Sequence, residues 1–126
     1  MATVVFDSGA LIALDRGDRA VAAALVAAVA DGSVAVTSSA CVAEVWRDPA
    51  RQARLTRALA GFREHSLDHR RARLCGSLLA SAGVHDIADA AVCELARDGD
   101  TVLTSDPGDI ARLLRAAGVN AHVRAV

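Results

Sequence analysis

Thr3-Val4-Val5-Phe6-Asp7-Ser8-Gly9 opens this chain as an apolar run that ends in an aspartate, and Thr101-Val102-Leu103-Thr104-Ser105-Asp106 repeats the pattern near the other end. Each stretch predicts a short buried strand that runs directly into a carboxylate. In an open parallel sheet, ligands lie beyond the carboxyl ends of the strands. The sequence contains no lysine to neutralise carboxylates delivered to that edge. The pattern therefore favours a site for a divalent metal.

Length and composition predict a single domain, residues 1–126, with a substantial apolar core. The longest apolar run, residues 20–30, is shorter than the roughly 20 residues that span a bilayer, and it predicts a packed helix instead. The first strand begins almost at Met1, which leaves no room for a signal peptide. Cys41, Cys75 and Cys93 are odd in number and lack metal-site spacing, so they are expected to be reduced core residues. We expect a cytoplasmic protein without a membrane partner.

Strand-like apolar runs alternate with helical patterns along the chain. This alternation predicts an α/β fold with a mostly parallel sheet of four to five strands flanked by helices. The strands are expected near residues 2–6, 34–37, 65–67, 101–104 and 121–125. Segment 34–46 is ambiguous, because its valines favour a strand whereas Ser38-Ser39 favours the start of a helix that carries Glu44.

Four local signals mark expected helix ends. Asp48-Pro49 and Asp106-Pro107 each predict an N-cap followed by proline at the first helical position. Gly83 and Gly118 predict helix C-termini.

Carboxylates from distant parts of the sequence are predicted to meet at the carboxyl edge of the sheet. Asp7 and Asp106 follow strands, and Asp86 and Asp89 open the helix that runs back before the 101–104 strand. Glu44 is expected near the start of the helix after the second strand. The predicted metal ligands are Asp7, Glu44, Asp89 and Asp106, with Asp86 and Asp109 nearby.

Such oxygen ligands suit Mg²⁺ or Mn²⁺, which polarise phosphate and activate water for in-line displacement. Taken singly, Asp86, Asp89 and Asp106 are equally well explained as helix N-terminal residues. The convergence of four carboxylates on one edge favours the metal site.

With these residues identified, the chain resembles the PIN-domain ribonucleases and, within them, the VapC-type toxins of bacterial toxin–antitoxin pairs. Four pieces carry the resemblance, in the order of that family: Val4-Val5-Phe6-Asp7-Ser8-Gly9-Ala10-Leu11, Val42-Ala43-Glu44-Val45, Asp86-Ile87-Ala88-Asp89-Ala90-Ala91-Val92 and Leu103-Thr104-Ser105-Asp106-Pro107-Gly108-Asp109. The resemblance implies a three-layer PIN-like fold, a Mg²⁺ or Mn²⁺ site and endonucleolytic cleavage of RNA. It also implies a homodimer and an antitoxin that blocks the acidic pocket.

The resemblance carries residue roles onto this sequence. The four acidic positions of the family match Asp7, Glu44, Asp89 and Asp106, which would be the catalytic residues. Ser8 matches a hydroxyl residue that supports the first aspartate, and Thr104 matches one that precedes the last. The third position stays open between Asp86 and Asp89; the Ala-Ala that follows Asp89 favours the latter.

Arginine supplies all 14 basic residues, and eight of them lie between positions 47 and 73. The guanidinium fork suits phosphate, and phosphate contacts dominate affinity for nucleic acids. Arg47, Arg51 and Arg54 are predicted to line one side of a helix; with Arg16 and Arg19 they are candidates for RNA binding. The alternative is a solvated charged face.

The remaining functional side chains give weaker signals. His65 and His69 have the spacing of a zinc pair but lack further ligands, whereas His85 beside Asp86 remains a candidate for the acidic site. Trp46 is expected to pack in the core rather than against a partner. Receiver domains and haloacid-dehalogenase-type phosphatases are disfavoured. Proteins of both kinds use a lysine at the phosphoryl site, and this sequence contains none.

The sequence thus predicts a metal-dependent endoribonuclease that acts as a toxin. Two alternatives remain: a catalytically weak PIN-like protein that binds RNA or a partner, and a metal-dependent phosphatase or DNA nuclease.

Overall fold

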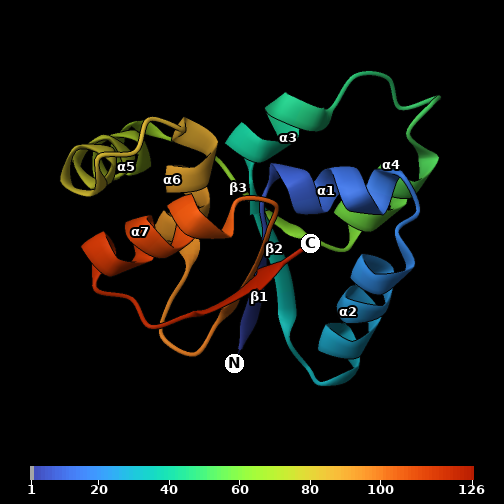
Figure 1. Cartoon of the computed structure of the whole chain (residues 1–126). Helices are drawn as coiled ribbons and strands as arrows, with labels where there is room; N and C mark the ends of the chain where they lie inside the picture. Colours follow the sequence, from blue (N-terminus) through green and yellow to red (C-terminus); the bar gives the residue numbers. More distant parts are fainter. Residues whose placement is uncertain (1) are drawn as a thin grey trace.

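A sheet of parallel strands forms the centre of the molecule. The computed structural model describes residues 2–126 and has a five-stranded sheet in the order β3-β2-β1-β4-β5 (Figure 1). All four strand pairs are parallel, so the prediction of an α/β fold is confirmed. The strands are β1 (Thr3–Phe6), β2 (Val34–Ser38), β3 (Arg63–His65), β4 (Thr101–Thr104) and β5 (His122–Ala125).

Seven helices cover the sheet, and together with it they make three layers. The helices are α1 (Ser8–Asp15), α2 (Arg19–Ala30), α3 (Ser39–Val45), α4 (Ala53–Ala60), α5 (His69–Ala82), α6 (Ile87–Leu95) and α7 (Pro107–Ala117). Helix α1 contacts α2 and α4 on one side of the sheet, and α5, α6 and α7 contact one another on the other side (Figure 1). The short helix α3 contacts both α1 and α6, so it lies across the top of the two groups.

Most predicted element ends agree with the structure. Asp106 caps α7, which begins at Pro107, and Gly83 and Gly118 end α5 and α7 in left-handed conformations with φ of 66° and 69°. The ambiguous segment contains both expected elements: β2 ends at Ser38, whose side chain accepts a hydrogen bond from the Ala40 N–H and so begins α3.

Two boundary predictions are wrong. The third strand is Arg63–His65 rather than 65–67, because the Asp68 carboxylate accepts a hydrogen bond from the Arg71 N–H and starts α5 immediately afterwards. Asp48-Pro49 does not begin a helix either. The Asp48 carboxylate accepts from the Ala50 N–H and closes a turn, and α4 starts only after the buried Gln52.

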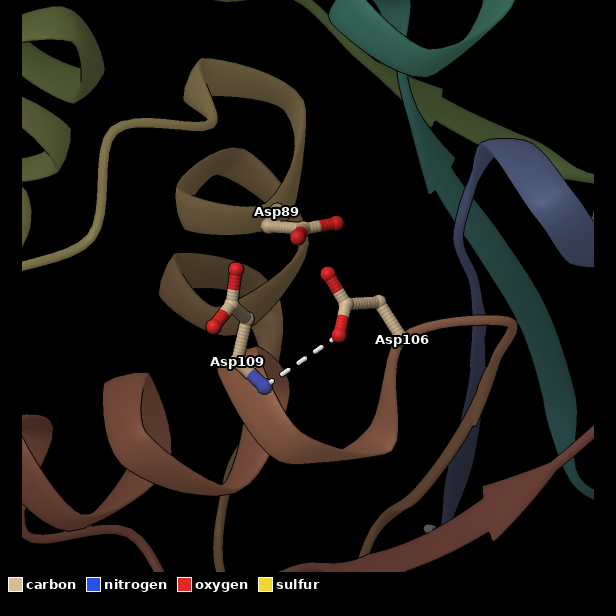
Figure 2. A group of neighbouring side chains, drawn as sticks. All are labelled: Asp89, Asp106 and Asp109. Carbon is tan, nitrogen blue, oxygen red and sulfur yellow. Dashed lines mark hydrogen bonds between the residues drawn. The ribbon is translucent and has the colours of Figure 1, made fainter.

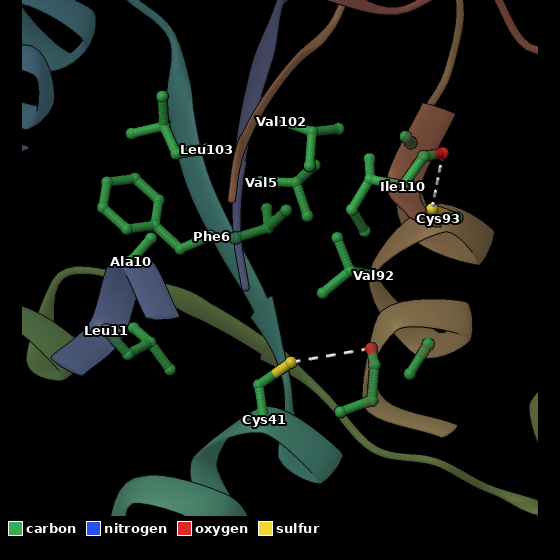
Figure 3. Close-up of a cluster of buried hydrophobic side chains, with 14 of the residues drawn as sticks. Val5, Phe6, Ala10, Leu11, Cys41, Val92, Cys93, Val102, Leu103 and Ile110 are labelled. Carbon is green, nitrogen blue, oxygen red and sulfur yellow. Dashed lines mark hydrogen bonds between the residues drawn. The ribbon is translucent and has the colours of Figure 1, made fainter. Parts of the chain in front are cut away.

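The core lies on both faces of β1 and β4 (Figure 3). Fully buried side chains include Val5, Phe6, Leu103 and Ile110, and the Phe6 ring meets Phe62 edge-to-face at 4.9 Å between centroids. Trp46 is half-buried against this core, as expected. Apolar strands flanked by apolar helix faces thus stabilise the sheet that carries the carboxyl edge.

The three cysteines are buried and unpaired, as predicted. Burial raises the pKa of the Cys41 thiol to about 12, so this sulfur packs as an apolar atom that donates weakly to the Ala88 carbonyl (Figure 3). Burial also raises the pKa of Cys93, whose thiol points to the carbonyl of Ile110.

Helix α2 packs against the core as expected, through Val21 and the partly buried Ala24, Leu25 and Ala28, but its other side is exposed. Val21 is its only buried residue, whereas Val26 and Val29 are 69% and 59% exposed. The alanine-rich sequence offers apolar residues on every side, so its pattern does not reveal which side faces the sheet. Within the described chain, no helix has both the length and the apolar character needed to cross a membrane.

Candidate metal centre at the carboxyl edge of the sheet

Asp7 joins three elements at the carboxyl edge. Its N–H donates to the Leu103 carbonyl at 3.1 Å, which continues the pairing of β1 with β4 by one residue. Its carboxylate accepts from the Ala10 N–H at 2.8 Å, as the N-cap of α1, and from the Ser105 N–H at 3.1 Å. Burial raises the pKa of Asp7, and a hydrogen bond from the Thr104 side chain opposes the rise. This buried carboxylate therefore ties α1 to the loop before α7.

Gly9 allows this close approach, a role that the sequence alone does not predict. A Cβ placed on Gly9 would lie 2.0 Å from the Ser105 Oγ and 2.4 Å from the Ser105 Cβ. No side chain therefore fits at position 9 while Ser105 keeps its place. The available signal is glycine at the second position of a predicted helix, where a better helix former would otherwise be expected.

Three carboxylates converge beside this junction (Figure 2). Each of Asp89, Asp106 and Asp109 offers an oxygen within 4.8 Å of the other two. Asp89 is buried in the first turn of α6, Asp106 is the exposed N-cap of α7, and Asp109 is half-buried one turn later. The Asp109 N–H donates to the Asp106 carboxylate at 3.4 Å, so α7 itself fixes the spacing of these two residues. Helix starts on opposite sides of the β4–α7 loop thus bring the oxygens together.

The Asp89 carboxylate is the strongest electrostatic anomaly of the site. Its Oδ2 is buried and has no hydrogen-bond partner within residues 2–126. Burial raises the pKa of Asp89 to about 7, with further contributions from the charges of Asp86, Asp106, Asp7 and Asp109. A buried acceptor that faces other carboxylates is costly unless a cation meets it. The donor set, oxygen only, fits a hard divalent ion such as Mg²⁺ or Mn²⁺.

The other predicted acidic residues, Asp7, Glu44 and Asp86, do not belong to this trio. Asp86 caps α6 by accepting from the Asp89 N–H at 2.9 Å, so it positions Asp89 and lies outside the trio. Glu44 is exposed and stands near the end of α3, not near its start as expected. The Ser8 hydroxyl donates to Glu44 at 2.5 Å. Ser8 therefore supports Glu44, and Asp7 is supported by backbone N–H groups and Thr104.

The structure shows which residues Thr104 and Asp109 contact at this site. The buried Thr104 hydroxyl accepts from the Asp106 N–H at 2.8 Å, next to its contact with Asp7. Asp109, expected only near the site, is one of the three clustered carboxylates and also pairs with Arg112 at 3.7 Å.

The predicted arginine stripe does not lie on one helix. Arg47 follows α3 and donates to the carbonyls of Ala43 and Trp46. Arg51 lies in the turn before α4 and pairs with Asp48 at 3.8 Å. Of the three, only Arg54 lies in a helix. The turn closed by Asp48 breaks the expected helix. Arg19 begins α2, and Arg16 lines a hollow shared with Gly9 and Ser105, which places it beside the carboxyl edge.

The histidines contribute no second metal site. Among residues 2–126, the acidic trio is the one group of three or more His, Cys, Asp or Glu side chains whose ligand atoms come this close together. His65 ends β3 and His69 begins α5, so neither joins a metal cluster. His85 lies just before α6 and remains outside the trio.

Metal-free protein is expected to lose stability as the pH rises from about 4 to about 7. A carboxyl whose pKa is raised on folding binds its proton more tightly in the native state. Its stabilising protonation is complete below the unfolded pKa of about 4 and is lost as the pH passes the folded value, at a cost of up to about 4 kcal/mol. Thermal melts in EDTA across this range measure the effect.

Asp89→Asn is the control for that experiment. Its melting temperature should vary much less with pH, because the titrating group is gone. Equal pH slopes in the variant and the wild type would contradict the assignment of the effect to Asp89.

The sequence matches no protein-family model and no curated protein. The fold is similar to a chain in the crystal structure of VapBC2 from Rickettsia felis bound to a DNA fragment from their promoter. The TM-score is 0.70 and the sequence identity 12%, and the match covers 97% of this chain and 98% of that chain. It is also similar to a chain in the structure of FitAB bound to an IR36 DNA fragment, with a TM-score of 0.62 and 19% identity over 95% and 94% of the two chains. At these identities the likeness concerns the fold, and it confirms the predicted PIN-like α/β architecture.

Proposed function

We propose that this protein is a metal-dependent endoribonuclease and the toxin of a toxin–antitoxin pair. The observation that carries the proposal is the buried Asp89 carboxylate, which has an oxygen without a hydrogen-bond partner within residues 2–126 and clusters with Asp106 and Asp109 at the carboxyl edge of a parallel sheet. The likeness of the fold to chains of the VapBC2 and FitAB structures supports it. We also propose that residues 1–126 act as one domain.

The four proposed catalytic residues are Asp7, Glu44, Asp89 and Asp106, with Asp109 added by its place in the trio. These residues would hold one or two Mg²⁺ or Mn²⁺ ions. When bound, such an ion polarises phosphate and activates water, so no protein nucleophile is required.

The chain's own residues keep these ligands in place. Asp7 holds α1 against Ser105, and Ser8 orients Glu44 through its hydroxyl. Asp86 fixes the first turn of α6 and with it Asp89. Because each of these contacts is made by a strand end or a helix start, the site is preorganised before substrate arrives.

RNA would reach the site past a positive rim. Arg16 is the strongest candidate for a phosphate contact, because it lines the hollow next to Gly9 and Ser105. Arg19 follows at the start of α2, whereas Arg47, Arg51 and Arg54 form a looser group around the turn before α4. Arginine side chains there would offset the repulsion between an anionic backbone and the carboxylates.

Two protein partners belong to this proposal. An antitoxin would present a cation, such as arginine, to the acidic pocket. A second copy of the chain would cover apolar surface, for which the exposed Val26 and Val29 of α2 are candidates. Light scattering at micromolar concentration is expected to show a dimer, and a monomer throughout that range would contradict this part.

Cleavage of end-labelled RNA tests the proposed activity. We expect internal cuts with Mn²⁺ or Mg²⁺ and none with EDTA. Parallel reactions with DNA of the same sequence and with a phosphomonoester address the alternative of a DNA nuclease or phosphatase. Retention of RNA in a gel shift without metal-dependent cuts would identify the catalytically weak binder instead.

A further inference from the structure

A second charged hollow lies at the opposite edge of the sheet. It has a volume of about 200 Å³ and is lined by Thr3, Val34, Val36, Arg63, His65, Arg71, Leu95 and Arg97. Thr3, Val34 and Arg63 are the first residues of β1, β2 and β3, so the hollow is at the amino ends of these strands. The acidic trio lies at the carboxyl edge of the sheet, and none of its three residues lines the hollow. The hollow is therefore separate from the proposed catalytic site.

Three arginines line this hollow, and the side chains of two of them, Arg71 and the exposed Arg97, make hydrogen bonds. Arg71 donates through Nη1 to the buried Glu94 carboxylate at 2.7 Å, and its side chain is only 23% exposed. Arg97 donates through Nη1 to the carbonyls of Glu94 and Ala96 at 2.7 and 2.9 Å. Within the described chain, Nε and Nη2 of both arginines have no hydrogen-bond acceptor. Donors are thus fixed but unused, which lowers the entropy cost of binding an acceptor.

The third arginine is free. Arg63 lies on the edge strand β3 and has neither a side-chain hydrogen bond nor an ion pair within residues 2–126. The neighbouring Asp100 carboxylate offsets part of the positive charge, but its oxygens accept from the backbone N–H groups of Thr3 and Arg97 and not from an arginine side chain. Counted against the Glu94 and Asp100 carboxylates, the three arginines leave one net positive charge around the hollow.

We propose that this hollow binds a phosphate group. Arginine forks match the oxygens of phosphate and donate two hydrogen bonds at once. The side chains of Val34, Val36 and Leu95, which also line the hollow, carry no acceptor that would compete with the anion. The small volume suits a phosphate group rather than a whole nucleotide. The group can belong to a small phosphorylated molecule or to the backbone of an RNA chain that also reaches the carboxyl edge.

The test compares anions in EDTA, so that the acidic site holds no metal and the result is independent of the proposed nuclease activity. Inorganic phosphate is expected to raise the melting temperature of the wild-type protein above that in chloride of equal ionic strength. Arg63→Gln and Arg97→Gln should each lose most of this gain. Arg70→Gln is the matched control: Arg70 is exposed in the same arginine-rich segment and outside the hollow, so its variant should keep the gain.

Two further ligands separate the sources of the phosphate. Titration calorimetry with a nucleoside monophosphate and with a short RNA that lacks terminal phosphates gives their affinities. Dependence of RNA affinity on Arg63 indicates backbone binding, and dependence of monophosphate affinity alone indicates a small-molecule site. An equal phosphate effect in Arg63→Gln, Arg70→Gln and the wild type, or no effect beyond that of chloride, would overturn the proposal. The test does not depend on whether Arg97→Gln folds. Arg63→Gln alone decides it, because the Arg63 side chain makes no ion pair within residues 2–126 and its loss should leave the fold intact.

Discussion

Asp7→Asn is expected to reduce metal-dependent RNA cleavage by about 10-fold to 100-fold or more, the loss typical of groups that support a metal centre. Asparagine keeps one oxygen, so the cap on the Ala10 N–H survives. Its amide cannot accept from the Ser105 N–H while it caps α1, which costs about 1 kcal/mol. Removing a buried carboxylate whose pKa is raised offsets that loss. Activity should therefore fall far more than stability.

Asp100→Asn is the matched control for this prediction. Asp100 is also a buried carboxylate, and it also accepts from two backbone N–H groups, those of Thr3 and Arg97. It stands before β4, at the edge away from the acidic trio. The same substitution there should cost similar stability and leave cleavage unchanged. Wild-type turnover in Asp7→Asn would remove Asp7 from the metal site, and equal loss of activity in both variants would show that only stability had changed.

Much of the carboxyl edge is predictable because it follows from periodicity and chain direction. An apolar run that ends in aspartate indicates a strand and its carboxyl end together, so the sequence alone places Asp7 and Asp106 at this edge. The i,i+3 spacing of Asp86 and Asp89 puts both at one helix start, where the structure has them. That spacing does not decide which of the two is the ligand. The structure places Asp89 in the trio and Asp86 beneath it as a cap.

The errors have physical causes that differ from one element to the next. Asp48 has the composition of a helix N-cap, but its carboxylate closes a turn, and the Gln52 side chain accepts from the N–H groups of Arg47 and Asp48. The short edge strand β3 carries only three residues, too few for a periodic signal.

The arginine hollow escapes prediction for a related reason. Arg63, Arg71 and Arg97 come from a strand, a helix and the segment after another helix. No spacing along the chain links them, and they come together through the pairing of β2 with β1 and β3 and through the packing of α5 on α6. Composition indicates an excess of arginine in residues 47–73, whereas the cluster around the hollow takes only Arg63 and Arg71 from that segment.

Gly9→Ala is expected to destabilise the fold by about 1–3 kcal/mol, the usual cost of forcing an atom into a packed site. The added methyl would meet the Ser105 side chain at 2.0 Å, and this must move α1 away from the loop before α7. Alanine should otherwise favour a helix over glycine by up to about 1 kcal/mol, so a net loss is informative. Gly76→Ala is the control, since a Cβ there meets nothing within 4 Å; it should leave stability unchanged or raise it.

Combining Gly9→Ala with Ser105→Gly tests whether contact with the Ser105 side chain causes the loss of stability. If contact with Ser105 is the cause, the double variant should recover most of the stability lost in Gly9→Ala, and urea unfolding of the four proteins gives the coupling energy. Cleavage should follow the same order, because movement of Ser105 displaces the Asp7 contact and the neighbouring Asp106. Additive losses in the double variant would show that Gly9 is needed for another reason. Recovery of stability without recovery of cleavage would place Ser105 itself in the site, since glycine restores the space but not the hydroxyl.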